Sequence, residues 1–211
     1  MAILDHPQPT QLRVGTSAAI LRAIAEPSVT LAVWTRPPPP GLVAAADALV
    51  RHAPLTAIAE DRPDRAAARV AATLPIGACA RTRIAADIAR LGRLFAGLLA
   101  APAIRVRLEA MDGPACRLFH ADHVSLRLLC TYAGPGTEWV PDEAVDRGRL
   151  GDNDAAIRSP SAVRRLPRFA VGLLKGEAWP GNAGRGIVHR SAPADPSRPR
   201  LLLCLDEAGR F

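Results

Sequence analysis

The spacing of hydrophobic residues changes near residue 100 and divides the chain into two unlike parts. Before that point, apolar residues recur at the three- and four-residue spacing of an amphipathic helix. The segment 82–101 shows this best, with a stripe formed by Ile84, Ile88, Leu91, Phe95 and Leu98. Shorter segments of the same character are also predicted helices: 16–26, 41–52 and 64–74. The apolar segment 29–36 predicts one strand, which ends at a run of prolines.

After residue 100, short apolar segments alternate with turns. The segment 103–111, AIRVRLEAM, alternates apolar and charged residues as a half-buried strand does. Further predicted strands are 123–132, 137–140, 168–177, 184–191 and 200–206. Residues 141–161 are rich in turn formers and are expected to form a loop. Short strands joined by turns predict a β-sandwich or barrel rather than a parallel α/β sheet.

The composition is typical of a globular protein. The 211 residues are 49% hydrophobic and 22% charged, which suffices for one domain with a sizeable core. Arg or Pro interrupts the long apolar stretches, so no membrane-spanning segment is expected. Residues 1–12 lack the basic and apolar regions of a signal peptide. We therefore expect a cytoplasmic protein.

The net charge of +7 does not indicate a nucleic-acid-binding surface. Only Lys175 of the 27 basic residues is a lysine, and the arginines are spread along the chain without a block. This usage, with abundant Ala and Pro, is typical of a GC-rich bacterial genome. Few aromatic residues are present to stack on bases, so we expect a solvated basic surface and no nucleic-acid partner.

The segment FHADHVSLRLLCTY, 119–132, holds the first candidate for chemistry. His120 and Asp122 are two residues apart and share one face if the strand has already begun. The same parity places Tyr132 on that face and Arg127 on the other. His123 also points away, which makes it a poorer ligand than His120. The alternative is a set of ordinary surface and core histidines.

The segment GRGIVHRSAPADPSRPRLLLCLD, 184–206, holds the second candidate. His189 ends one predicted strand and Arg200 opens the next. A His-x-Asp pair with a distant His is the ligand set of the facial triad, which binds Fe(II) and leaves positions open for oxygen and a co-substrate. Arg200 can reach into the same cavity and pair there with a carboxylate.

This arrangement resembles the Fe(II)/2-oxoglutarate-dependent dioxygenases, whose pattern is His-x-Asp, a distal His and an Arg about ten residues on. The resemblance implies an α+β fold, a double-stranded β-helix (jelly roll) with a helical N-terminal half packed on it. It implies that Fe(II) is bound by His120, Asp122 and His189. It also implies that Arg200 holds the distal carboxylate of 2-oxoglutarate and that Tyr132 hydrogen-bonds it.

FHADHVSLRLLCTYAGPGTEW and LLKGEAWPGNAGRGIVHRS are also similar to an uncharacterised bacterial domain-of-unknown-function family found near zinc-homeostasis genes. This similarity covers about residues 80–206. We expect a single domain over 1–211. Its mostly helical part is 1–101, and the jelly-roll core that carries the site is 102–208.

The sequence departs from the dioxygenase pattern in ways that keep alternatives open. Leu202 stands where many of these enzymes have a serine, and Arg198 competes with Arg200 for the carboxylate-binding role. Cysteines near the site would favour Zn(II): Cys116, Cys130 and Cys204. The hypotheses are an oxygenase, a Zn(II)-binding sensor, store or chaperone of metal homeostasis, and a scaffold with a decayed site. The sequence indicates neither the substrate nor the oligomeric state.

Overall fold

The computed structural model describes residues 11–113, 116–193, 195 and 197–209, and these form a mixed α/β fold built around two sheets. The large sheet has seven strands in the order β1-β2-β8-β5-β10-β4-β3. Their bounds, in that order, are Leu12–Gly15, Leu31–Trp34, Val171–Lys175, Leu126–Ala133, Arg200–Glu207, Ile104–Met111 and Leu55–Asp61. Within the described residues, β1 and β2 are parallel and the other neighbours are antiparallel.

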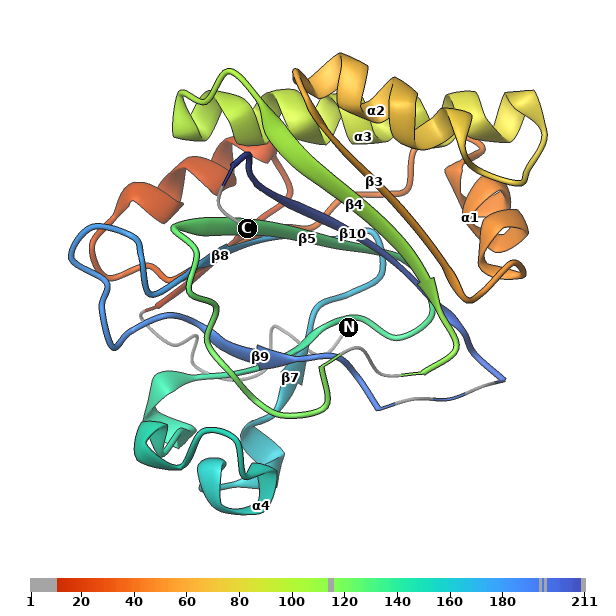
Figure 1. Ribbon diagram of the computed structural model, residues 1–211. Coiled ribbons are helices and arrows are strands. Elements are labelled where there is room, and N and C mark those ends of the chain that lie inside the picture. Colours follow the sequence, from red (N-terminus) through yellow and green to blue (C-terminus); the bar gives the residue numbers. More distant parts are fainter. Residues whose placement is uncertain (1–10, 114–115, 194, 196, 210–211) are drawn as a thin grey trace.

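Helices cover one face of the large sheet (Figure 1). They are α1, α2 and α3, over Leu42–Val50, Pro63–Ala72 and Ala78–Leu99, joined by the 3-10 helix η1, Ala18–Ala25. The predicted stripe of α3 packs against the alternate apolar residues of β4, β5 and β10, and it is buried except at Leu98, which is partly buried. This layer is the main hydrophobic core, since burial of apolar surface is the dominant favourable term in folding.

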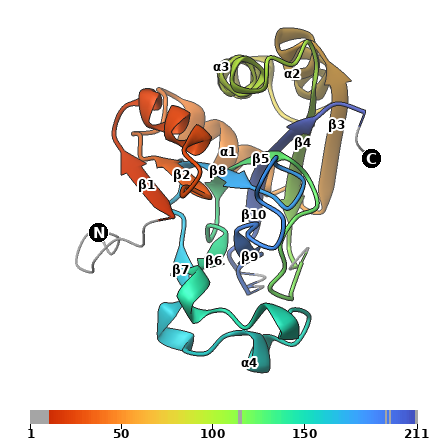
Figure 2. The ribbon, with the colours of Figure 1, turned by 90° about the vertical axis from the view of Figure 1, so that its left-hand side faces the viewer.

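A small antiparallel sheet lies against the other face (Figures 1 and 2). Its order is β7-β6-β9, with bounds Arg164–Arg165, Glu138–Val140 and Val188–Arg190. A second apolar cluster joins the two sheets and includes Leu129, Trp139, Ile187 and Leu202. The site described below lies between these sheets.

An insert follows β6 and covers the outer side of the small sheet (Figure 2). It contains the short helices η2, Asp142–Ala144, η3, Arg147–Arg149, α4, Asn153–Ala156, and η4, Pro160–Ala162. Its apolar residues pack with Phe119, Val140 and Val188 in a third cluster. The segment predicted as a loop therefore has its own small core.

The N-terminal part is less helical than expected. Three strands of the large sheet, β1, β2 and β3, come from residues before 101, and only β2 was predicted. The segment 16–26 forms a 3-10 helix rather than an α-helix. In β3 the buried positions are Ala57 and Ala59, whose small side chains gave no hydrophobic alternation to detect. None of the helices in the described residues is long and apolar enough to cross a membrane.

A candidate metal centre between the two sheets

Two histidines from distant parts of the chain lie side by side at this centre. His189 belongs to β9, and His120 pairs with it in an isolated antiparallel bridge. The His120 N–H donates to the His189 carbonyl at 3.1 Å, and the His189 N–H donates to the His120 carbonyl at 2.9 Å. The ring centroids are 4.6 Å apart. Backbone pairing therefore fixes the separation of the two imidazoles.

Asp122 is held beside them by a turn before β5. The Glu177 N–H donates to the Asp122 carbonyl at 2.9 Å. Gly176 allows this close approach, because a Cβ there would lie 2.8 Å from the same carbonyl oxygen and 2.1 Å from that of Val124. His120, Asp122 and His189 each offer a ligand atom, and these atoms lie within 4.8 Å of one another.

The hydrogen bonds of the imidazoles direct their Nε2 atoms at the carboxylate. Nδ1 of His120 lies 2.9 Å from the Leu118 carbonyl, and Nδ1 of His189 lies 3.1 Å from the Ile187 carbonyl. Each Nδ1 therefore carries a proton, and a neutral ring presents a lone pair at Nε2. Nε2 of His189 lies 3.3 Å from Asp122 Oδ2, and Nε2 of His120 lies 3.5 Å from Oδ1.

The protonation states favour a positive charge at this cluster. Burial lowers the pKa of His189 to about 4, so that ring is neutral at neutral pH. Burial alone would raise the pKa of Asp122, but the two histidines and Arg127 hold it well below its usual range. When the His120 ring is protonated, its hydrogen bond to Asp122 stabilises the charge and raises the pKa of His120 above its ordinary value. Asp122 Oδ2 is buried and has no hydrogen-bond partner among the described residues. Two lone pairs facing each other at His189 and Oδ2 repel unless a metal ion lies between them.

A cavity of about 70 Å³ adjoins the cluster. His120 and His189 line it together with Arg200, which opens β10. Leu129 and Leu202 supply apolar wall, and Thr137 supplies a hydroxyl. The cavity thus connects the candidate metal centre with a buried guanidinium.

Arg200 is buried without a counter-ion in the part of the chain that the structure describes. Its guanidinium donates to the hydroxyls of Thr137 at 2.6 Å, Ser191 at 3.0 Å and Thr131 at 3.5 Å. Its Nε has no partner there. Burial lowers the pKa of Arg200 to about 10, which still leaves it charged at neutral pH. A buried, unpaired guanidinium is a site for an anion, and its planar fork suits a carboxylate.

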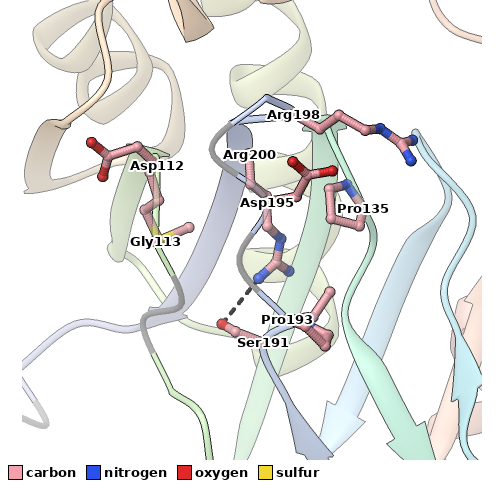
Figure 3. Close-up of a pocket in the computed structure, with 10 residues that line it drawn as sticks. Asp112, Gly113, Pro135, Ser191, Pro193, Asp195, Arg198 and Arg200 are labelled. Atoms are coloured by element: carbon pink, nitrogen blue, oxygen red, sulfur yellow. Dashed lines mark hydrogen bonds between the residues drawn. The ribbon is translucent and has the colours of Figure 1, made fainter.

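Arg198 does not share this position. Its side chain is exposed, and Figure 3 shows it directed away from Arg200 and Ser191. Figure 3 also shows the guanidinium of Arg200 extending toward Ser191, along the wall of a second, small pocket of about 10 Å³. Of the two arginines that compete for the carboxylate-binding role, Arg200 lies in the cavity.

Tyr132 lies on the opposite face of the sheet from the cavity, so its expected contact with 2-oxoglutarate is wrong. Its hydroxyl donates to Asp87 Oδ2 at 2.7 Å, within the helical layer. The expectation assumed one strand from residue 120 onward, whereas β5 begins at Leu126 after a turn. The turn reverses the parity, so that Arg127, Leu129 and Thr131 face the site.

Arg127 was expected to face away, yet it contacts the cluster directly. Its Nη1 lies 2.7 Å from Asp122 Oδ1, and its Nε donates to Asp206 Oδ1 at 2.7 Å. Sequence reasoning also missed the hydroxyls of Thr131, Thr137 and Ser191. A polar residue at alternate positions of an apolar strand, as at Arg127 and Thr131, was the available signal.

The cysteines do not join the three-residue cluster within the described residues. Cys116 is exposed and lines the cavity, whereas Cys130 packs in the helical core. Cys204 is buried in the layer between the sheets, where burial raises its pKa to about 12. A buried thiol with a raised pKa is a poor metal ligand, because the thiolate is the binding form.

The insert and Glu177 brace the ligand-bearing segments. Asn153 accepts a hydrogen bond from the Phe119 N–H at 2.8 Å and donates one to the Arg117 carbonyl at 2.9 Å, just before His120. The Glu177 side chain accepts hydrogen bonds from the N–H groups of Gly184 and Gly186, in the loop that leads to β9.

Comparison with solved structures shows a shared fold. The dioxygenase for auxin oxidation in rice matches with a TM-score of 0.55 and 16% identity, over 89% of this chain and 76% of that one. A full-length protein from Neurospora crassa, solved in complex with alpha-KG, matches with a TM-score of 0.51 and 10% identity, over 89% of this chain and 77% of that one. No curated protein matches the chain.

A family model matches residues 15–206, nearly the whole of the part that the structure describes. Its description is "Protein of unknown function (DUF1826)". The chain belongs to this family, and its fold resembles those of these two solved proteins, one of them a dioxygenase and the other solved with alpha-KG, as the sequence resemblance predicted.

Proposed function

We propose that this member of the DUF1826 family is an Fe(II)/2-oxoglutarate-dependent dioxygenase of the hydroxylase type. In this proposal it forms one domain with a jelly-roll core over 102–208, and Fe(II) is held by His120, Asp122 and His189. The observation that carries the proposal is that three lone-pair donors converge beside a cavity that also contains a buried, unpaired arginine. A metal-binding protein without an anionic co-substrate has no need of that arginine.

The donor set suits Fe(II). Two neutral imidazoles and one carboxylate bind one side of the ion and leave its other positions open. The bound iron would supply the activation of oxygen that such hydroxylation requires. Asp122 Oδ2 fits this role because it lacks a hydrogen-bond partner among the described residues, and His189 fits it because the bond from Nδ1 to the Ile187 carbonyl leaves the lone pair at Nε2.

The residues around Arg200 prepare it to bind 2-oxoglutarate. Thr137 and Ser191 accept hydrogen bonds from its guanidinium, which orients the fork before any ligand arrives. Binding of a carboxylate then costs little free energy for reorienting the guanidinium. The ion pair is also stronger in the buried surroundings than it would be in water. Leu129 and Leu202 would flank the methylene groups of the co-substrate and exclude water from it.

The alternative is a non-redox Zn(II) protein of metal homeostasis that uses the same three ligands. A His/Asp/His set also binds Zn(II), and exposed Cys116 on the cavity wall could add a thiolate. Arg200 argues against this alternative, because a zinc store has no need of a buried arginine in the cavity, whereas an anionic co-substrate would pair with it.

The test is an anaerobic titration of metal-free protein with Fe(II) and 2-oxoglutarate, followed by visible absorbance. We expect a charge-transfer band from chelated 2-oxoglutarate in the wild type and none in His120→Ala. A second titration with Zn(II) in place of Fe(II) is the control for metal binding alone. Tight Zn(II) binding with no band in the Fe(II) titration would exclude the dioxygenase and favour the zinc protein.

A further inference from the structure

Arg127 joins two buried carboxylates beside the candidate metal centre. Its Nη1 lies 2.7 Å from Asp122 Oδ1. Its Nε and Nη2 donate to Asp206 Oδ1 and Oδ2 at 2.7 and 3.2 Å. The side chains of Arg127, Asp122 and Asp206 are only 13%, 11% and 4% exposed. These ion pairs are therefore shielded from solvent. A shielded ion pair of this kind keeps a defined geometry.

The two oxygens of Asp122 have different surroundings as a result. Oδ1 is engaged by Arg127 at 2.7 Å and lies 3.5 Å from Nε2 of His120, whereas Oδ2 is buried without a hydrogen-bond partner in the described part of the chain. Oδ2 is also the oxygen that lies 3.3 Å from Nε2 of His189. Asp122 precedes β5 and lies in a turn, so the strand itself does not fix its side chain.

We propose that Arg127 is a positioning residue for the metal centre. Anchored on Asp206, it holds Oδ1 of Asp122 in an ion pair and so leaves Oδ2 available to bind the metal. This inference rests on the proposed function, because it requires a metal at the His120, Asp122 and His189 site.

An ordinary structural ion pair would need only one of these carboxylates. Asp206 already satisfies two of the three nitrogens of Arg127, and Cys204 Sγ in turn lies 3.5 Å from Asp206 Oδ2. The remaining nitrogen reaches outside this pair to Asp122. A guanidinium suits this bridge better than the ammonium group of a lysine, because its nitrogens are held in one plane and point in fixed directions toward the two carboxylates.

The experiment measures Mn(II) binding to metal-free protein, with free Mn(II) detected by electron paramagnetic resonance. We expect Arg127→Gln and Arg127→Lys each to weaken Mn(II) binding by about 10- to 100-fold, as is typical when a residue that orients a metal ligand is lost. The lysine variant separates positioning from charge, because it keeps the positive charge and loses the fork. Wild-type affinity in Arg127→Lys, or tighter binding in Arg127→Gln, would overturn the inference.

A second variant guards against loss of folding in the Arg127 variants. Asp206→Asn keeps the shape of the anchor but removes its charge and one acceptor, and we expect binding to weaken by roughly 3- to 10-fold. Unchanged affinity in folded Asp206→Asn would contradict the anchoring role. Arg165→Gln is the matched control: it breaks the ion pair to Glu138 on a side chain that is 52% exposed, and should leave Mn(II) binding unchanged.

Two further results separate this inference from the proposed function. If the wild type does not bind Mn(II), or if His189→Ala binds it equally well, the metal centre itself is wrong. If His189→Ala loses binding while the Arg127 and Asp206 variants keep it, only the positioning role fails.

Discussion

The two sides of the large sheet each bury an arginine, and the surroundings of the two arginines differ. On the helical side, Arg36 donates to both oxygens of Asp87 at 2.6 and 2.7 Å and to the Phe169 carbonyl at 3.1 Å. Tyr132 completes the network by donating to Asp87. On the cavity side, Arg200 meets hydroxyls, and among the described residues it has no carboxylate partner.

This difference teaches which buried charges point to a ligand. The Arg36 network is closed, because charge and hydrogen bonds are satisfied within the protein. The cavity side is open, because Arg200 Nε and Asp122 Oδ2 are buried without partners in the described residues. A closed network contributes to the fold, whereas an open one implies a missing partner of opposite charge. The predictions below test this distinction.

The largest expected effect on stability comes from removing the carboxylate of the Arg36 network. Asp87→Ala leaves Arg36 buried and unpaired, and should lower the free energy of unfolding by about 3–5 kcal/mol. Urea denaturation measures it. The control is Asp64→Ala, which removes an exposed ion pair with Arg93 on the surface and should change stability by no more than about 0.5 kcal/mol. An equally small loss for Asp87→Ala would show that the network contributes little to the fold.

Removing Arg200 should leave stability intact and weaken ligand binding instead. Arg200→Met deletes a buried charge that has no counter-ion in the described structure, so the melting temperature without ligand should stay equal or rise. Affinity for 2-oxoglutarate in the presence of Fe(II) should fall by about 100-fold, because the bound carboxylate loses its partner. Calorimetry of both proteins measures the two effects. A marked loss of stability with unchanged affinity would place Arg200 among the structural residues.

A smaller effect should appear as a dependence of stability on pH. In metal-free protein the pKa of His189 is about 4, against an ordinary value of 6.5, so the folded state resists its protonation. Above pH 6.5 the histidine is neutral in both states and costs the folded state nothing. As the pH falls from 6.5 toward 4, the unfolded state binds a proton that the folded state does not, so the free energy of unfolding decreases. Urea denaturation at about pH 7 and about pH 5 should show this loss, and His189→Gln should reduce it. Replacing the exposed His52 by Gln is the control, and an equal pH dependence in His189→Gln and wild type would contradict the prediction.

The sequence predicted the elements whose alternation or stripe was strong. β4 and α3 lie close to where their apolar patterns placed them. The sequence hypothesis placed the His-x-Asp pair and the distal histidine in one metal site. In the structure their possible ligand atoms lie within 4.8 Å of one another. Their role as metal ligands stays a proposal. Sequence could not reveal β3, because alanine on its buried face leaves no contrast with the exposed face.

The alternation of side chains along a strand gave a wrong prediction for the segment before β5, because the backbone turns there. The turn before β5 moved Tyr132 to the helical side and Arg127 to the cavity side, opposite to the expectation. That turn depends on Gly176, more than fifty residues away in sequence, whose lack of a Cβ admits the carbonyls of Asp122 and Val124. The direction of side chains was predicted from the local sequence alone, and the local sequence contains no information about a distant residue such as Gly176.

The place of β10 in the large sheet has a consequence for the order of assembly during synthesis. β4 and β5 precede it in the chain, yet they meet only through β10, which pairs with both. Until residues 200–207 leave the ribosome, strand pairing leaves β4 with β3 on one side and β5 with β8 on the other. Arg200 and Asp206 both lie on β10, which follows the other six strands of the large sheet in the sequence. A nascent chain therefore cannot complete the cavity between the sheets before β10 has been made, because Arg200 lines that cavity and β10 joins the two halves of the large sheet.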